Sequence, residues 1–285
     1  MNIAHQTGRV RSGDVTIHWL RLGKAGATPL FIVHGLQYFS WDWLEVAQAL
    51  GAEREVLAID MRGFGDSTWS EQKDYSVPTM AQDIVNVLDH VGWRRAALIG
   101  HSMGGRSTTY AAAKNPARVA ALALIDYTPD NAPAGTKRTT ELVGNTPESF
   151  PSLEAARAYL NPRKTVERYS HYLKQEHSRF SVKRDLFFSA QFKKVLAGGE
   201  RPKLGVDMWR LLGEVRCPLL SVRGARSDMY AADTVQKMKH ANPRLQVAEV
   251  EAGHDIAGEN PAALIDVLRT FLATVEDKSH AHQRG

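Results

Sequence analysis

The 285 residues are 43% hydrophobic and 24% charged, which is typical of a soluble globular protein with one large core, or one core with an insertion. No apolar stretch approaches the roughly 18 residues of a transmembrane helix, and the amino terminus lacks the apolar segment of a signal peptide, so we expect a cytoplasmic protein that contacts no membrane. A single cysteine, Cys217, excludes an intrachain disulfide and a cysteine metal site, and we expect it to be a small buried residue.

The formal net charge of +5 is concentrated in one middle segment. Residues 131–207 hold 14 Lys and Arg against 8 Asp and Glu, whereas the rest of the chain holds 22 against 23. This excess is read either as a solvated helical surface or as a surface that steers an anionic substrate inward. No nucleic-acid-binding motif accompanies the charge, so a nucleic-acid partner is not expected.

The first part of the chain predicts apolar strands that alternate with helices. In chain order, the expected elements are a strand over 15–19, a strand over 29–33, a helix over 41–50, a strand over 56–59 and a helix over 79–91. His34 follows the second strand, Asp60 follows the third, and Gly92 ends the last helix.

Gly100-His101-Ser102-Met103-Gly104 stands between an expected strand over 96–99 and an expected helix over 107–113. Gly-x-Ser-x-Gly in that context is typical of a nucleophile elbow. The turn is so tight that the positions two before and two after the serine need almost no side chain. We therefore expect Ser102 in a strained backbone conformation, with its hydroxyl lifted clear of the sheet.

A further strand over 121–125 ends in Asp126, and the alternating pattern then breaks. Residues 131–207 show no continuous strand and predict helices over 153–160, 165–175 and 185–196, which indicates an inserted helical cap. Beyond the cap, the expected elements are a strand over 219–222, a helix over 232–240, a strand over 245–250 and a helix over 263–272. The sequence thus predicts a core over 1–130 and 208–275, a cap over 131–207 and a disordered tail over 276–285.

Several motifs of the sequence together resemble those of a known protein family. They are His34-Gly35, Asp60-x-Arg62-Gly63-Phe64-Gly65-x-Ser67, the elbow with Gly105 after it, Gly224-Ala225-Arg226-Ser227-Asp228, and Gly253-His254 with Glu259-Asn260-Pro261. With them the chain resembles the capped members of the α/β-hydrolase superfamily over nearly its whole length outside the cap. The resemblance implies an α/β fold with a mostly parallel central sheet, flanking helices and an inserted cap, and a serine, acid, histidine order along the chain.

A serine hydroxyl needs an adjacent base to remove its proton, and His254 is the candidate for that base. His101 and His34 are read as packing and loop-shaping residues. Two carboxylates compete to orient His254. The resemblance favours Asp228, and Asp126 is the alternative, since some relatives carry the acid at that earlier strand end.

The resemblance also implies two backbone N–H groups for the oxyanion, those of Leu36 and Met103. It assigns Arg62 a structural role in bracing loops. The basic cap supplies the substrate-binding candidates, which are Arg138, Arg157, Arg163, Arg168, Arg179, Tyr159, Tyr169, His171 and Tyr172.

Serine as nucleophile leaves two reactions open: acyl transfer to water from an ester, lactone or amide, and carbon–carbon hydrolysis of a dienoate ring-cleavage product. His101 and Asp255 stand where carbon–carbon hydrolases usually have Asn and Trp, which favours the first. The basic cap suits a small carboxylate-bearing substrate, as in capped hydrolases such as (acetamidomethylene)succinate hydrolase. A non-catalytic binding protein is the alternative from another class. We expect no cofactor and no metal, and the sequence leaves a homodimer open.

Overall fold

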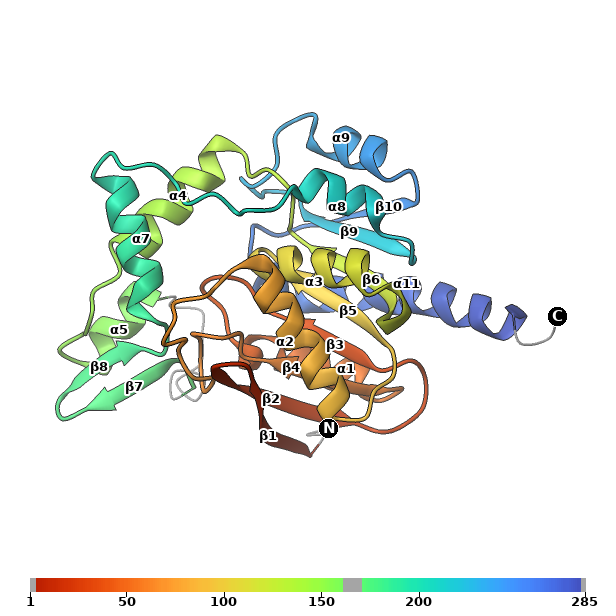
Figure 1. The fold of residues 1–285 in the computed structure, drawn as a ribbon, viewed down its shortest axis with the longest axis horizontal. Helices are drawn as coiled ribbons and strands as arrows, with labels where there is room; N and C mark the ends of the chain where they lie inside the picture. Colours follow the sequence, from red (N-terminus) through yellow and green to blue (C-terminus); the bar gives the residue numbers. More distant parts are fainter. Residues whose placement is uncertain (1–3, 161–170, 283–285) are drawn as a thin grey trace.

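A twisted sheet with helices on both faces forms the larger part of the molecule, and a smaller helical unit stands at one end of it (Figure 1). The computed structural model describes residues 4–160 and 171–282. The sheet has eight strands in the order β1-β2-β4-β3-β5-β6-β9-β10. They are β1 His5–Ser12, β2 Val15–Gly23, β3 Leu30–Val33, β4 Glu55–Ile59, β5 Ala96–His101, β6 Val119–Ile125, β9 Leu219–Gly224 and β10 Leu245–Val250.

Strands β3, β4, β5, β6, β9 and β10 of this sheet run parallel to one another, whereas β2 pairs antiparallel with both β1 and β4. The parallel strands β3, β5 and β6 are buried along their whole length, because helices cover both faces. This burial explains why they appear in the sequence as continuous apolar runs. The expected α/β fold class with a mostly parallel sheet is confirmed.

Two hydrophobic cores lie on the two faces of the sheet. The helices are α1 Leu44–Leu50, α2 Val77–His90, α3 Met103–Lys114, α8 Met208–Glu214, α9 Thr234–Ala241, α10 Ile256–Glu259 and α11 Pro261–His282, with short 3-10 turns at Ser40–Trp43 and Pro116–Arg118. Apolar side chains of α2, α3, α8 and α9 fill one core, and those of α1, α10 and α11 fill the other.

The smaller unit comprises α4 Pro133–Gly144, α5 Leu153–Leu160, α7 Leu186–Leu196 and a hairpin of β7 Leu173–Glu176 with β8 Arg179–Val182. These elements fall within residues 131–207 and lie at the left of Figure 1. Strand β7 corrects the end of the expected helix over 165–175, of which residues 165–170 lie outside the described residues, and the hairpin corrects the expected absence of strands. Its connection, His177-Ser178, takes a positive φ of 55° at His177 without a glycine, so the usual hairpin signal is missing.

The carboxyl terminus also differs from expectation. Helix α11 continues to His282, well past Leu272 and into the segment expected to be disordered. Val275 packs into the core, and Glu276 accepts a hydrogen bond of 2.7 Å from the buried guanidinium of Arg54. These two contacts with distant parts of the chain hold the start of that extension, and local composition does not reveal them.

Candidate active site

The carboxyl ends of β5, β6 and β9 lie side by side, and a candidate functional residue follows two of them directly. Ser102 comes after β5, and its N–H donates to the Ile125 carbonyl at 3.1 Å. Asp126 comes after β6, and its N–H donates to the Val222 carbonyl of β9 at 2.8 Å. The sheet ladder therefore extends one residue past the strands and fixes both residues at the same edge.

The turn at Ser102 has the strained backbone expected of it, with φ 49° and ψ −117°. A side chain at Gly104 would collide with the carbonyls of Val33 and His34, and one at Gly100 would collide with the Thr108 hydroxyl. Glycine is thus required at both positions by close packing. Ser102 precedes Met103, the first residue of α3, so its side chain lies at the positive end of the helix dipole.

A chain of hydrogen bonds joins three side chains that are far apart in the sequence. The Ser102 hydroxyl lies 3.0 Å from Nε2 of His254, and Nδ1 of His254 lies 2.6 Å from Oδ2 of Asp126. Asp126 is fully buried. Its carboxylate also accepts from the Gly224 N–H at 2.9 Å and from the Ser227 hydroxyl at 2.5 Å. These donors compensate the burial of the carboxylate and fix its orientation toward the imidazole.

The structure brings Asp126, and not Asp228, to Nδ1 of His254. Both Asp228 oxygens accept from Arg138 instead, from Nε at 2.6 Å and Nη2 at 2.9 Å. This pair holds the pKa of the Asp228 carboxyl below its ordinary value, chiefly through those hydrogen bonds. The geometry therefore corrects the preference for Asp228, because the loop after β9 supplies Ser227 to support Asp126 rather than supplying the acid.

The other histidines near the elbow hold loops in place. His101 is buried, and its Nε2 lies 3.0 Å from the carbonyl oxygen of His254, the geometry of an imidazole N–H donating to that oxygen. His34 accepts from the Met61 N–H at Nε2 and contacts the Gly35 carbonyl through Nδ1. Tyr38, which the sequence reading did not single out, lies edge-on to His101 with ring centres 4.6 Å apart. It covers the side of the elbow next to the loop that follows His34.

The two backbone N–H groups expected to bind an oxyanion belong to Leu36 and Met103. Met103 begins α3, so its N–H has no partner within the helix. Within residues 4–160 and 171–282, neither N–H donates to another protein group. Both residues are partly buried at the elbow side of the sheet.

The predicted substrate-binding residues of the cap have different surroundings. Arg138 pairs with Asp228, and Tyr172 is buried with its hydroxyl on the Asp42 carboxylate and its ring 4.5 Å from that of Phe39. Arg163, Arg168 and Tyr169 lie outside the described residues. Arg157 also takes part in contacts. Arg179, on the exposed hairpin, donates to the Ser149 hydroxyl.

A cavity of about 390 Å³, counting the part open to solvent, lies between the cap and the loop after β3. Gln37 and Phe39 of that loop line it, together with Thr146, Tyr159, Tyr172 and Arg184 of the cap. Sequence reasoning missed Arg184. The signal that could have found it is its place between Lys183 and Asp185, in the stretch where the cap chain returns to the core.

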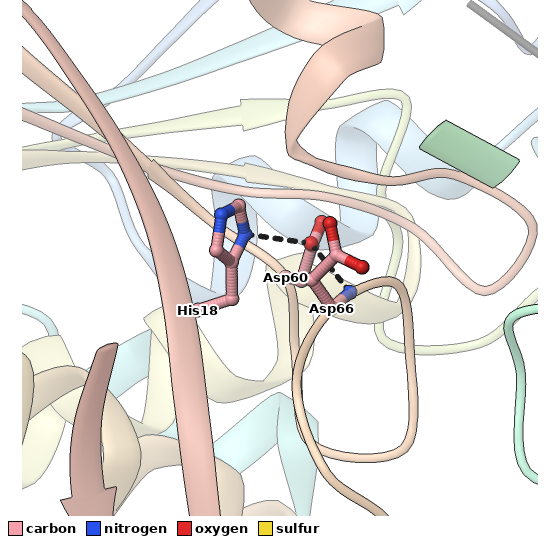
Figure 2. Close-up of side chains that lie close together, drawn as sticks. All are labelled: His18, Asp60 and Asp66. Atoms are coloured by element: carbon pink, nitrogen blue, oxygen red, sulfur yellow. Dashed lines mark hydrogen bonds and ion pairs between the residues drawn. The ribbon is translucent and has the colours of Figure 1, made fainter. Parts of the chain in front are cut away.

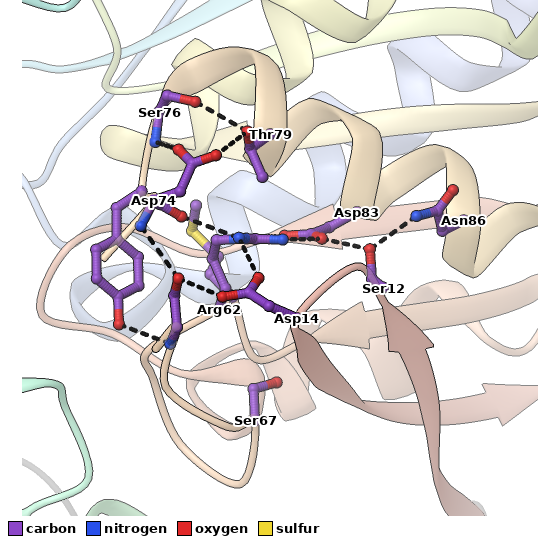
Figure 3. A network of polar contacts seen from close by, with 12 residues as sticks. Ser12, Asp14, Arg62, Ser67, Asp74, Ser76, Thr79, Asp83 and Asn86 are labelled. Atoms are coloured by element: carbon purple, nitrogen blue, oxygen red, sulfur yellow. Dashed lines mark hydrogen bonds and ion pairs between the residues drawn. The ribbon is translucent and has the colours of Figure 1, made fainter. Parts of the chain in front are cut away.

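The turn after β4 is held in place by buried polar contacts. Arg62 is buried and donates to both oxygens of Asp83, to Asp14 and to the Asp74 carbonyl (Figure 3). Beside it, His18, Asp60 and Asp66 place potential metal-ligand atoms within 4.8 Å of one another (Figure 2). The Asp60 carboxylate is already bonded to His18 and to the N–H groups of Ser40 and Asp66, so it holds the turn together.

Two further findings concern single features. Cys217 is buried, as expected, and its burial raises the pKa of the thiol to about 12. In the part of the chain that the structure describes, no helix combines the length and the apolar character needed to cross a bilayer.

A family model described as the alpha/beta hydrolase fold matches residues 28–261. The chain belongs to this family. It is 27% identical to 2-(acetamidomethylene)succinate hydrolase of Mesorhizobium japonicum over 93% of this chain and 94% of that protein. The crystal structure of E-2-(acetamidomethylene)succinate hydrolase superimposes with a TM-score of 0.81 at 24% identity, over 95% of this chain and 100% of that one.

A second relative shares only one segment. The acetyltransferase component of the acetoin cleaving system of Pseudomonas putida is 39% identical over 113 residues, which is 40% of this chain and 30% of that protein. The chain thus spans about a third of the length of this relative.

Proposed function

We propose that this α/β-hydrolase-family chain is a serine hydrolase that cleaves an ester, lactone or amide of a small carboxylate-bearing substrate through an acyl-enzyme. Ser102 is the nucleophile, His254 the general base and Asp126 the acid that orients the imidazole. The observation that carries this proposal is the continuous hydrogen-bond chain from the Ser102 hydroxyl through His254 to the buried Asp126. A lone serine lacks the base that this chain supplies.

In the first half-reaction, Ser102 Oγ attacks the substrate carbonyl while its proton passes to Nε2 of His254. The carbonyl oxygen becomes an oxyanion, toward which the N–H groups of Leu36 and Met103 donate. The tetrahedral intermediate collapses, the bond to the leaving group breaks, and His254 returns the proton to that group. The acyl group is left on Ser102.

In the second half-reaction, His254 takes a proton from water, and the hydroxyl oxygen attacks the acyl carbon. The bond to Oγ breaks, Oγ regains its proton, and a carboxylic acid leaves. Asp126 stays ionised throughout and stabilises the imidazolium. Its donors, Gly224 N–H and Ser227, support this role because they favour the charged carboxylate.

The substrate class rests on two supports. The cap segment carries the excess of basic residues, which raises the local concentration of anions. One relative that matches along nearly the whole chain is named for a substituted succinate, a carboxylate-bearing compound. Both favour a substrate with a free carboxylate near the scissile bond.

Labelling with a fluorophosphonate probe tests the nucleophile. We expect one covalent adduct on Ser102, and Ser102→Ala to lose both the adduct and the turnover of p-nitrophenyl acetate. Ser107→Ala removes another serine of α3, one turn further along and bonded to the Gly104 carbonyl, and serves as the matched control that keeps the label. An adduct that persists in Ser102→Ala would contradict the proposal.

A substrate panel tests the reaction. Neutral esters, carboxylate-bearing esters and amides, and a dienoate ring-cleavage product are compared by kcat/KM. We expect the carboxylate-bearing acyl compounds to be preferred, and added salt to weaken that preference. Turnover of the dienoate alone would instead identify carbon–carbon hydrolysis. No turnover with no adduct would point to a binding protein.

A further inference from the structure

The cavity beneath the cap is lined by one charged side chain, Arg184, that pairs with no acid among the described residues. Arg184 is 5% exposed, and its Nη2 donates to the hydroxyls of Thr146 at 2.9 Å and Ser189 at 3.2 Å. Among the described residues, no carboxylate lies within ion-pair distance of its guanidinium. Hydroxyls solvate a buried charge only in part, so burial lowers the pKa of Arg184 to about 10.

The neighbours of Arg184 show why its side chain cannot turn away. Lys183 bonds Asp66 at 2.8 Å, and Asp185 bonds Lys73 at 2.9 Å, so both flanking residues are tied to the core. The Lys183 carbonyl accepts from the Gly65 N–H, and the Asp185 N–H donates to the Gly63 carbonyl, each at 2.7 Å. Alternate residues of an extended segment point to opposite sides, so this docking directs Arg184 into the cavity.

The cavity reaches the loop after β3, which carries one of the two proposed oxyanion donors. Its lining includes Gln37 and Phe39, one and three residues after Leu36, whose N–H is a proposed oxyanion donor. The other polar side chains that line the cavity are the hydroxyls of Thr146, Tyr159 and Tyr172 and the amide of Gln37. Thr146 and Tyr159 both donate to the Leu142 carbonyl. The cavity therefore offers one positive charge, several hydroxyl groups, one amide and apolar walls.

We propose that Arg184 binds the free carboxylate of the substrate, and that this contact selects anionic over neutral acyl compounds. A planar guanidinium binds a carboxylate through two parallel hydrogen bonds. This inference rests on the proposed function, because it deepens the substrate class of that same site.

The test compares matched pairs of substrates that differ by one carboxylate. The three half-esters are monomethyl succinate, monomethyl glutarate and monomethyl adipate. Each is compared with the neutral methyl ester of equal acyl chain length, which lacks the second carboxylate. We expect at least one half-ester to be preferred by the wild type. Arg184→Met should lower its kcat/KM by roughly 10- to 100-fold, mostly through KM, and change turnover of the neutral ester by less than about threefold.

Two further variants keep the result interpretable. Lys193→Gln removes one charge from the exposed end of α7 and should leave the preference unchanged, which separates a local contact from the general field of the cap. Arg184→Lys keeps the positive charge but cannot form two parallel hydrogen bonds, so it should retain part of the preference for the half-ester. This variant replaces Arg184→Met in the test if the methionine variant does not fold. Equal losses on both ester types, or no loss on either, would overturn the proposal.

A binding measurement separates this inference from the proposed nucleophile. In the Ser102→Ala background, we expect calorimetry to detect monomethyl glutarate but not methyl pentanoate, and Arg184→Met to weaken monomethyl glutarate binding by a similar roughly 10- to 100-fold. Loss of turnover in Ser102→Ala with no binding of monomethyl glutarate would retain the hydrolase and reject the role of Arg184. Binding that depends on Arg184, in a protein whose turnover does not depend on Ser102, would retain the role of Arg184 and reject the serine hydrolase.

Discussion

Two aspartates near His254 have opposite surroundings, and this contrast assigns their tasks. Asp126 has no exposure and directs its carboxylate at Nδ1 of His254, with Gly224 and Ser227 as its other donors. Asp228 faces a guanidinium from the cap, so its charge is already neutralised by a bidentate pair. An acid engaged in this way has no free oxygen directed at an imidazole. Its task is to join the cap to the core.

Asparagine at each position tests this division. Asp126→Asn should lower kcat by roughly ten-thousand-fold, because an amide no longer selects the correct tautomer or stabilises the imidazolium. Asp228→Asn removes the same charge from the same region and is the matched control, with an expected loss of about tenfold or less. Both variants are first compared with the wild type by thermal unfolding. Equal losses, or a larger loss in Asp228→Asn, would contradict the assignment.

At the scale of elements, the turn after β4 shows how the sheet edge is held in place. Arg62 is 2% exposed. From the turn after β4 it contacts Asp14 in the turn between β1 and β2, Asp83 in α2 and the Asp74 carbonyl just before α2. Asp83 is itself buried, and Ser12 also donates to it. A buried pair of this kind adds little net stability, but removal of one partner leaves an uncompensated charge.

Arg62→Met should therefore lower the free energy of unfolding by about 3–5 kcal/mol, measured by urea denaturation. The double variant Arg62→Met/Asp83→Leu should recover most of that loss, since it replaces both charges with apolar groups. Arg11→Met on the exposed strand β1 is the control, with an expected change within about 0.5 kcal/mol. A double variant less stable than the single one would show that the pair contributes net stability.

How much of these elements the sequence predicts depends on whether the determining contacts are local. The strands over 56–59 and 121–125 and the elbow at Ser102 were predicted because continuous apolar runs and glycine spacing are local signals. The hairpin at His177 and the contact of Arg54 with Glu276 depend on partners elsewhere.

The candidate site divides in the same way. Ser102 and His254 follow from motifs, and the structure brings them together. The choice between Asp126 and Asp228 depends on what faces each carboxylate, namely Ser227 and Arg138. The flanking Lys183 and Asp185 mark the stretch around Arg184 in the sequence, but only the structure shows that Arg184 is buried without an acid partner among the described residues.

At the scale of the whole molecule, charged contacts at separate points dock the cap on the core. Lys183 bonds Asp66, Lys73 bonds Asp185, and Arg138 bonds Asp228. The family resemblance predicts that a cap exists but not how it is docked. Since the proposed carboxylate-binding residue lies in the docked segment, the integrity of these contacts should govern substrate selection as well as the stability of the cap.

The pH dependence of docking follows from Asp185. Burial raises the pKa of its carboxyl, but hydrogen bonds from Lys73, the Phe187 N–H and Tyr75 outweigh that effect, and the pKa lies below its ordinary value of 3.8. A carboxyl with a lowered pKa stabilises the docked state at every pH above its unfolded value and loses that contribution as pH falls through the folded value. The wild-type cap should therefore stay docked at pH 5 and loosen only below about pH 4.

The variant Asp185→Asn tests this dependence, because asparagine can still serve as the N-cap residue of helix α7 but carries no charge. At pH 7, amide exchange in Leu186–Leu196 should be roughly tenfold or more faster in the variant than in the wild type, while β5 and β6 stay unchanged. As pH falls through the folded pKa of Asp185, the two proteins should converge, since protonation removes the same charge. Asp207→Asn replaces the N-cap residue of α8, away from these docking contacts, and is the matched control. Equal exchange in variant and wild type at pH 7 would mean that the Asp185 charge does not dock the cap.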